Sequence, residues 1–137
     1  MSSTQRMPTI SEIMTSRVHT AKPDQSLGEI WQILVDEHCH HVPIVEGRRP
    51  IGMISTRDLI RVARQHGSQK IADAVYGDQT AREIMHAGVE TIGAGESVEF
   101  AIDRIGIGDI HALVVVDDED EIVGIVTNHD LLDYLIS

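Results

Sequence analysis

The chain has 137 residues, 42% of them hydrophobic, and its 22 Asp and Glu residues against 11 Lys and Arg give a formal net charge of -11. This length and apolar content suit one compact domain or two small units, and the negative charge makes nucleic acid and anionic membranes poor partners. The single cysteine, Cys39, excludes an internal disulfide, and no apolar run is long enough to span a membrane, so we expect a cytoplasmic protein.

The first half of the chain predicts the element order strand, helix, strand, strand, helix. After a polar lead-in and a short apolar turn, an extended piece is expected at 18–21, and residues 41–45 and 51–54 are typical of a β-hairpin. Apolar residues at helical spacing predict amphipathic helices that begin after Ser26 and after Ser55. The side chains expected to face inward from these two helices are Leu27, Ile30, Trp31, Leu34, Leu59, Ile60 and Ala63.

The second half of the chain repeats the first, element by element. Met14 and Met85, which end two short Ile-Met turns, lie 71 residues apart, whereas Asp58 and Asp130, near the start of the last helix of each half, lie 72 residues apart. The single inserted residue falls in the turn of the second hairpin, an exposed position where insertions cost least. A register that is kept over the whole half chain indicates a duplicated structural unit.

These spacings divide the chain into a lead-in at 1–9, a first motif at 10–67, a connector at 68–79 and a second motif at 80–137. The connector is expected to contain one or two helical turns. Each motif has about 60 residues, which is marginal for independent stability. We therefore expect an α/β fold of two β-α-β-β-α motifs, each a small sheet packed against a helix pair. The motifs would be related by a pseudo-two-fold and share one aliphatic core.

The most informative stretches are two copies of one strand-to-helix corner, Gly-Met-Ile-Ser-Thr-Arg-Asp at 52–58 and Gly-Ile-Val-Thr-Asn-His-Asp at 124–130. A carboxylate held in the first turn of a helix suits the hydroxyls of a ribose, and a helix N-terminus supplies amide donors for a phosphate. Asp58 and Asp130 are therefore candidate ribose ligands. The candidates that would face a phosphate are Ser55, Thr56, Arg57, Thr127, Asn128 and His129.

The same corner sequence has a purely structural interpretation. Ser-x-x-Asp is an ordinary capping sequence, in which the aspartate supports only its own helix. For a single copy, capping is the simpler interpretation, but the duplication favours a ligand. The two roles are compatible, because one side chain can cap a helix and bind a ligand.

The motifs in this order resemble the CBS domain, and the two copies resemble the paired arrangement called a Bateman module. The resemblance rests on Ile-Met, Val-x-Thr, a helix, His-x-Val-Pro-Ile-Val and Gly-x-x-Ser/Thr-x-x-Asp-Leu, and it covers about residues 10–135. Val114 stands where the first half has Pro43. The resemblance implies a non-catalytic regulatory module that binds AMP, ADP, ATP or S-adenosylmethionine in two clefts and needs no obligatory cofactor. It also implies a disc-like homodimer that acts on a separate, unidentified protein.

The resemblance further implies that each cleft draws on both motifs. The adenine-side contacts of the Asp130 site would come from Thr20, Ala21, His41, Val42 and Pro43, and Lys22 would lie near the phosphate. Those of the Asp58 site would come from Thr91, Ile92, Leu113 and Val114. The Asp130 site has more polar and basic neighbours, so we rank it first.

Parts of the sequence are compatible with three other functions. One is a ligand-free dimerisation module with capped, empty corners. Another is a metal or pH sensor built on His38-Cys39-His40-His41, but these four residues are too close in sequence to converge readily on one tetrahedral ion, so no metal site is expected. The third is an enzyme, and the sequence offers no nucleophile-base pair, no phosphate loop and no metal-ligand set for catalysis. The acidic turn 117–121 lacks the spacing and glycine of a calcium loop.

Overall fold

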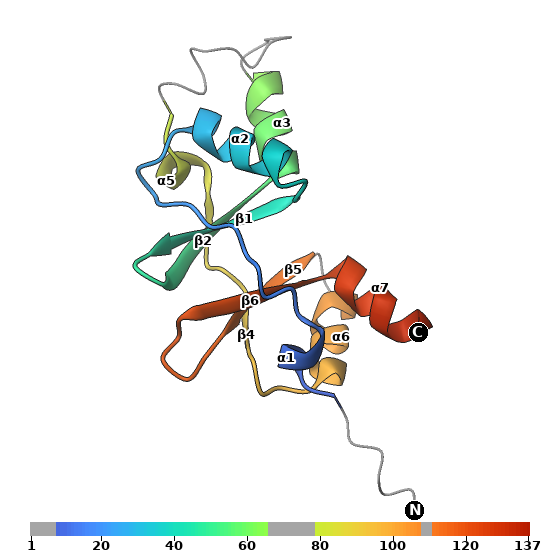
Figure 1. The fold of residues 1–137 in the computed structure, drawn as a ribbon. Coiled ribbons are helices and arrows are strands. Elements are labelled where there is room, and N and C mark those ends of the chain that lie inside the picture. The colour runs from blue at the N-terminus through green and yellow to red at the C-terminus, as the bar shows by residue number, and fades with distance from the viewer. Residues whose placement is uncertain (1–7, 66–78, 108–110) are drawn as a thin grey trace, which may run out of the picture. The chain divides into compact units, whose positions relative to one another are not determined.

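The computed structural model describes residues 8–65, 79–107 and 111–137, and the chain divides into two compact units (Figure 1). The middle unit is His19–Val89, and the terminal unit joins Met1–Val18 to Glu90–Ser137. Among the described residues, no helix has the length and apolar character needed to cross a membrane. The mixed α/β fold expected from the sequence is confirmed.

The middle unit contains a three-stranded antiparallel sheet in the order β1-β2-β3. Its elements are α2 (Leu27–Asp36), β1 (His41–Glu46), β2 (Arg49–Ser55), α3 (Thr56–Gln65), α5 (Ala81–Ile84) and β3 (His86–Ala87). Ser26 caps α2 by accepting a hydrogen bond from the Glu29 amide at 3.2 Å, as the sequence predicted. Gly47, at φ +64°, turns the hairpin between β1 and β2.

The terminal unit has a second three-stranded sheet, in the order β4-β5-β6. Its elements are α1 (Ile10–Ile13), β4 (Thr91–Gly93), α6 (Val98–Ile107), β5 (Ala112–Val116), β6 (Ile122–Thr127) and α7 (Asn128–Ile136). The first pair of strands is parallel and the second antiparallel. The two hairpins have the same irregularity at matching positions, between Ile44 and Val45 in one and between Val115 and Val116 in the other, as expected of a true repeat.

Each unit takes its first short helix from the other sequence motif. In the terminal unit, the Ile10 and Ser11 amides donate to the carbonyls of Glu96 and Ala94, at 2.8 and 3.0 Å. In the middle unit, the Ala81 amide donates in the same way to the Gln25 carbonyl at 2.8 Å. The sequence motifs and the compact units therefore have different boundaries, and each Ile-Met turn lies against the hairpin of the other motif.

This exchange explains the glycine that opens each corner. A Cβ built on Gly52 would overlap the Met85 side chain, and one built on Gly124 would overlap Met14. Since both clashes involve the methionine of an Ile-Met turn, the turn and the glycine form one packing unit. A side chain at either glycine would push the turn away from its strand.

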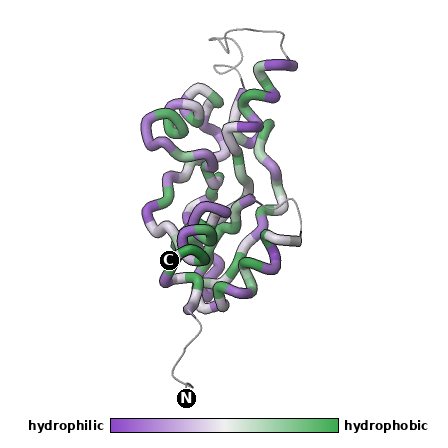
Figure 2. Tube along the Cα trace, turned by 90° about the vertical axis from the view of Figure 1, so that its right-hand side faces the viewer, coloured by the Kyte–Doolittle hydropathy of each residue, from purple (hydrophilic) through white to green (hydrophobic). Residues whose placement is uncertain are grey.

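The buried aliphatic residues form two clusters, one in each unit, and the shared core expected from the sequence stays a prediction. Two expectations about burial are wrong. Trp31 is 42% exposed and Ile60 is 57% exposed, although both were expected to face inward. Each occupies the edge of an apolar stripe, and the buried part of the stripe is filled by neighbours such as Ile30 and Leu59. Figure 2 shows hydrophobic and hydrophilic residues following one another along the helices, as one-sided burial requires.

Two further expectations concern connecting segments. The extended piece at 18–21 is not a strand, because only Ala21 pairs, in an isolated bridge to Ile44. Strand β3, which follows the second Ile-Met turn, was not predicted from the sequence. The helical turns expected in the connector at 68–79 lie outside the described residues.

Candidate functional site

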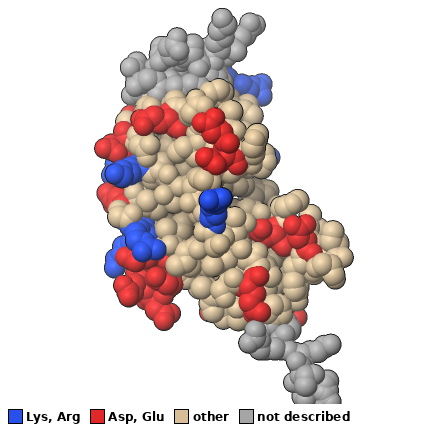
Figure 3. Space-filling view, viewed as in Figure 1, with Lys and Arg blue, Asp and Glu red and all other residues tan. Residues whose placement is uncertain are grey.

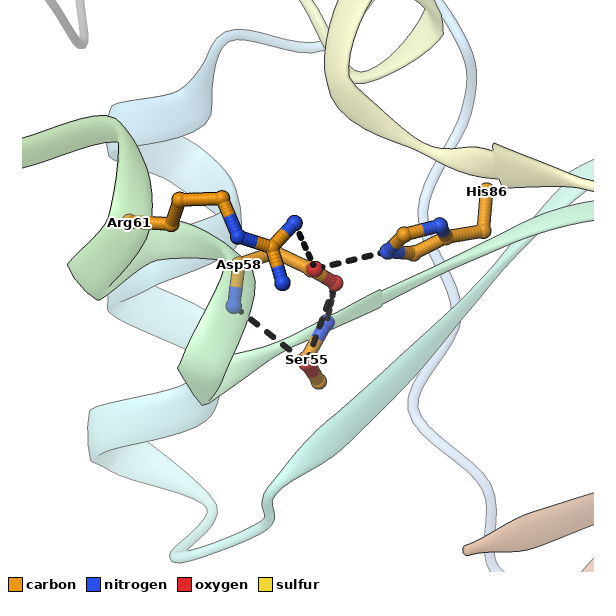
Figure 4. Close-up of polar contacts among 4 residues, drawn as sticks. All are labelled: Ser55, Asp58, Arg61 and His86. Atoms are coloured by element: carbon orange, nitrogen blue, oxygen red, sulfur yellow. Dashed lines mark hydrogen bonds and ion pairs between the residues drawn. The ribbon is translucent and has the colours of Figure 1, made fainter. Parts of the chain in front are cut away.

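The corner at Asp58 is a complete capping box. Ser55 ends β2, and its amide and hydroxyl both donate to Asp58 Oδ2, at 2.8 and 3.0 Å. In return the Asp58 amide donates to Ser55 Oγ at 3.3 Å (Figure 4). The capping interpretation of the sequence is thus correct for this aspartate, and one carboxylate oxygen is fully used by it.

The second oxygen of Asp58 is held by two basic side chains (Figure 4). His86 Nε2 lies 2.7 Å from Asp58 Oδ1, and Arg61 Nη1 lies 3.4 Å from the same atom. Asp58 is 3% exposed, and within the described residues it is the one charged side chain classed as buried. The pairing satisfies the rule that a buried charge needs opposite charge and hydrogen bonds.

These contacts lower the pKa of Asp58. Burial by itself would raise the pKa of the carboxyl, but hydrogen bonds from His86 and from the Ser55 amide and hydroxyl outweigh it. The group is therefore a carboxylate, which only accepts hydrogen bonds. Since a carboxylate cannot donate, the His86 Nε2 atom carries the proton.

The corner at Asp130 is also capped but is more open. The Thr127 amide and hydroxyl donate to Asp130 Oδ2 at 2.9 and 3.3 Å. The Thr15 hydroxyl donates to Asp130 Oδ1 at 3.1 Å. Asp130 is half-buried, in the first turn of α7. Its Oδ1 atom therefore accepts from a neutral donor, whereas Oδ1 of Asp58 contacts an imidazole and a guanidinium.

Thr15 and His86 are equivalent residues of the two motifs, each directly after an Ile-Met turn. Neither residue was predicted from the sequence as part of a site, and nor was Arg61, whose equivalent in the second motif is Asp133. The sequence does show that Thr15 and His86 occupy the same position after the two Ile-Met turns. It does not show that each turn packs on the other motif, and this packing is what brings the two residues to the aspartates.

The middle unit brings together three of the predicted stretches. The Ala21 amide donates to the Pro43 carbonyl at 3.0 Å, so 20–22 lies beside the start of β1. Thr56 belongs to the corner at 52–58, and its amide donates to the His40 carbonyl at 3.0 Å. This corner therefore lies next to His41, the first residue of β1. The Lys22 amide is bonded to Gln25 Oε1 at 2.7 Å. The side chains of Ala21 and Val42 are buried, so these residues can offer a ligand mainly backbone.

The terminal unit aligns the remaining stretches in one sheet. Thr91 pairs with Val114, and Ala112 pairs with Thr127, so β4, β5 and the last corner are adjacent. Ile92, Leu113 and Val114 are buried. Asn128 and His129 form the first turn of α7, where His129 Nε2 lies 3.7 Å from Asp133 Oδ2. The assignment of adenine-side residues to particular corners stays a prediction.

The charges suit a small ligand better than a polyanion. Figure 3 shows Asp and Glu spread over the face drawn, with only scattered Lys and Arg.

The described residues contain no group of three or more His, Cys, Asp or Glu that could hold a metal ion. Burial raises the pKa of Cys39, which makes its thiol a poor nucleophile. In the acidic turn, Asp117 Oδ1 accepts the amides of Glu119 and Glu121 at 2.9 and 3.0 Å.

Comparison with known proteins identifies both halves of the chain. The family model described as CBS domain matches residues 10–65 and 81–137. The CBS domain pair of protein MJ0100, in complex with 5′-methylthioadenosine and S-adenosyl-L-methionine, is 26% identical in sequence. The match covers 95% of this chain and 97% of that one, with a TM-score of 0.81.

Two relatives are longer proteins. Protein MJ1232 of Methanocaldococcus jannaschii is 26% identical over 90% of this chain, which spans 38% of MJ1232. The gamma-3 subunit of human 5′-AMP-activated protein kinase is 30% identical over 76% of this chain, which spans 22% of that subunit. The chain thus spans well under half the length of these relatives.

Proposed function

Because this chain belongs to the CBS domain family, as a tandem pair, we propose that it is a non-catalytic regulatory module that binds an adenosyl ligand. Two relatives support the ligand class. MJ0100 is in complex with two adenosyl compounds, and the kinase subunit belongs to an enzyme named for activation by AMP. The free Cys39 thiol supports a cytoplasmic setting.

The observation that carries the proposal is the state of Asp130. Its Oδ2 atom is used for capping, but Oδ1 holds the hydroxyl of Thr15 at 3.1 Å, a contact that another hydroxyl can replace. A ribose hydroxyl would donate to this oxygen, with little net loss of hydrogen bonding. The exchange is favourable because the ligand finds the carboxylate already fixed by the helix cap.

The first turn of α7 supplies the rest of the proposed contacts. A phosphate of AMP, ADP or ATP would be attracted to the amides of Asn128 and His129 and to the positive end of the helix. The His129 side chain is 83% exposed and would be available to the same group. An uncharged 5′ group, as in 5′-methylthioadenosine, would use the ribose contact alone.

We also propose that the module forms a homodimer and acts on a separate protein. Within the terminal unit, the neighbouring helices α6 and α7 expose large apolar side chains, with Phe100 at 45%, Leu132 at 55% and Leu135 at 59%. In the middle unit, α2 and α3 expose Trp31, Val35 and Ile60. The exposed apolar side chains on each helix pair, taken unit by unit, support self-association.

The second candidate is a ligand-free dimerisation module, which the capping bonds favour. Both aspartates complete their helix caps without a ligand. If this were their whole role, replacing either would only destabilise the chain, by about 1 kcal/mol for the lost helix cap and, at Asp58, by the further loss of the contacts with His86 and Arg61.

Calorimetry separates these functions. AMP, ATP, 5′-methylthioadenosine and S-adenosylmethionine are titrated into the wild-type chain, Asp130→Ala and the control Asp103→Ala, which removes an exposed charge from α6. We expect saturable heat with at least one compound, a Kd raised at least about tenfold by Asp130→Ala, and no more than a twofold change in the control. No heat with any compound at millimolar concentration would refute ligand binding.

A further inference from the structure

We propose that His86 and Arg61 close the Asp58 corner to ligand, so that the chain binds one adenosyl molecule, at the Asp130 corner. This inference rests on the proposed function and deepens it by fixing which of two duplicated sites is used. It depends on how the two equivalent carboxylates are occupied and on which residues stand at matching positions of the two motifs.

Both carboxylate oxygens of Asp58 are occupied. Oδ2 accepts two hydrogen bonds from Ser55, and Oδ1 accepts from His86 at 2.7 Å and from Arg61 at 3.4 Å. A ribose would need Oδ1, and it would have to displace a short bond from an imidazole and the guanidinium of an ion pair. One sugar hydroxyl would replace two contacts with basic side chains, and the displaced groups would leave the carboxylate without its ion pair, so the hydroxyl does not compensate for that loss.

The residues around Asp130 differ from those around Asp58. There the equivalent of His86 is Thr15, whose neutral hydroxyl donates at 3.1 Å, and the equivalent of Arg61 is the acidic Asp133. A ligand hydroxyl would replace a hydroxyl, and no cation paired with Asp130 would be displaced. The difference between the corners therefore comes from two substitutions, at the residue after the Ile-Met turn and at the third residue after the aspartate.

His86 and Arg61 are much more exposed to solvent than the carboxylate that they contact. The side chain of Asp58 is 4% exposed, whereas those of His86 and Arg61 are 63% and 53% exposed. The two basic groups thus lie on the outside of the carboxylate and belong to the surface. Their replacement should uncover Asp58 without removing a side chain from the core.

The test exchanges the residues that distinguish the corners. In calorimetric titration with 5′-methylthioadenosine and with AMP, the wild-type chain should bind one molecule. The double variant His86→Thr with Arg61→Asp, which copies the Asp130 corner, should bind two. The reverse variant, Thr15→His with Asp133→Arg, should lose binding at the remaining site or weaken it at least tenfold. Thermal melting of each variant checks that it is folded.

Single variants make the assignment independent of the double ones. Asp58→Ala in the wild-type background should leave the stoichiometry unchanged and the Kd within twofold, whereas Asp130→Ala should raise the Kd at least about tenfold. Two molecules bound by the wild-type chain, or binding lost on Asp58→Ala and kept on Asp130→Ala, would overturn the proposal. So would a stoichiometry of one in the folded variant that opens the Asp58 corner. Absence of heat in every variant would instead remove the proposed function itself.

Discussion

His86 Nε2 lies 2.7 Å from Asp58 Oδ1 and joins the second sequence motif to the helix cap of the first. The contact exists because the Ile-Met turn that precedes His86 packs on the hairpin of the other motif, where Met85 covers Gly52. One exchange of short segments thus explains the glycine of the corner, the burial of Asp58 and the partner of its carboxylate.

The Asp58 carboxylate should make the protein sensitive to acid. Because the pKa of Asp58 is lower in the folded chain than the usual value of about 3.9, its stabilising effect is present above about pH 4 and is lost as the pH falls through the folded pKa. Asp58→Asn should cost about 2 kcal/mol at pH 7 and less at low pH, since the wild type loses the same interactions there.

Urea denaturation at pH 7 and near pH 3 measures this difference. Asp103→Asn, an exposed carboxylate on α6, serves as the control and should leave the pH dependence of the wild type intact. The pKa of Glu29 is also lowered, by hydrogen bonds from Ser26 and Gln25, so Asp58→Asn should reduce the acid sensitivity but not remove it. An equal stability loss at both pH values would contradict the ionic role of Asp58.

The two corner glycines should reject any side chain. Gly52→Ala and Gly124→Ala should each lower the free energy of unfolding by about 1–3 kcal/mol, because the new methyl group overlaps Met85 or Met14. Gly95→Ala, where a Cβ meets no atom within 4 Å, is the matched control and should change stability by less than about 0.5 kcal/mol.

A double-mutant cycle then tests the cause. Adding Met85→Ala to Gly52→Ala makes room for the methyl group, so the two substitutions should cost less together than the sum of the single losses. Strict additivity would show that the glycine is needed for another reason than the packing of the Ile-Met turn.

The proposed dimer depends on apolar side chains of α7. Leu132 and Leu135 are 55% and 59% exposed, and Leu132→Glu with Leu135→Glu would place charges in the contact. We expect sedimentation equilibrium to give a dimer for the wild-type chain and a monomer for this variant, with an unchanged dimer for Glu99→Gln on the neighbouring helix α6. A monomeric wild type at micromolar concentration would contradict self-association.

Much of the fold was predictable because the relevant signals are local and written twice. The caps at Ser26 and Ser55, both hairpins and the long helices that flank them follow from spacing and turn residues within each motif. The capping role of Asp58 and Asp130 also followed from the three-residue spacing of the corner sequence.

The unpredicted features depend on segments distant in sequence. Thr15 reaches Asp130 across 115 positions, and His86 reaches Asp58 across 28. Helical periodicity marked Trp31 and Ile60 as inward, but a stripe predicts only the side of a helix that is apolar, and neighbours decide how much of it is covered. The sequence already ranked the two corners as unequal, but the contribution of His86 and Thr15 to that difference depends on the exchanged turns and could not be predicted from the corners alone.

The most direct test of the account is a crystal structure of the chain grown with 5′-methylthioadenosine. The account predicts a ribose hydroxyl within hydrogen-bond distance of Asp130 Oδ1, with the Thr15 hydroxyl displaced or shared, and the bond between His86 and Asp58 intact. A ribose bound to Asp58, or a ligand bound away from both aspartates, would contradict it.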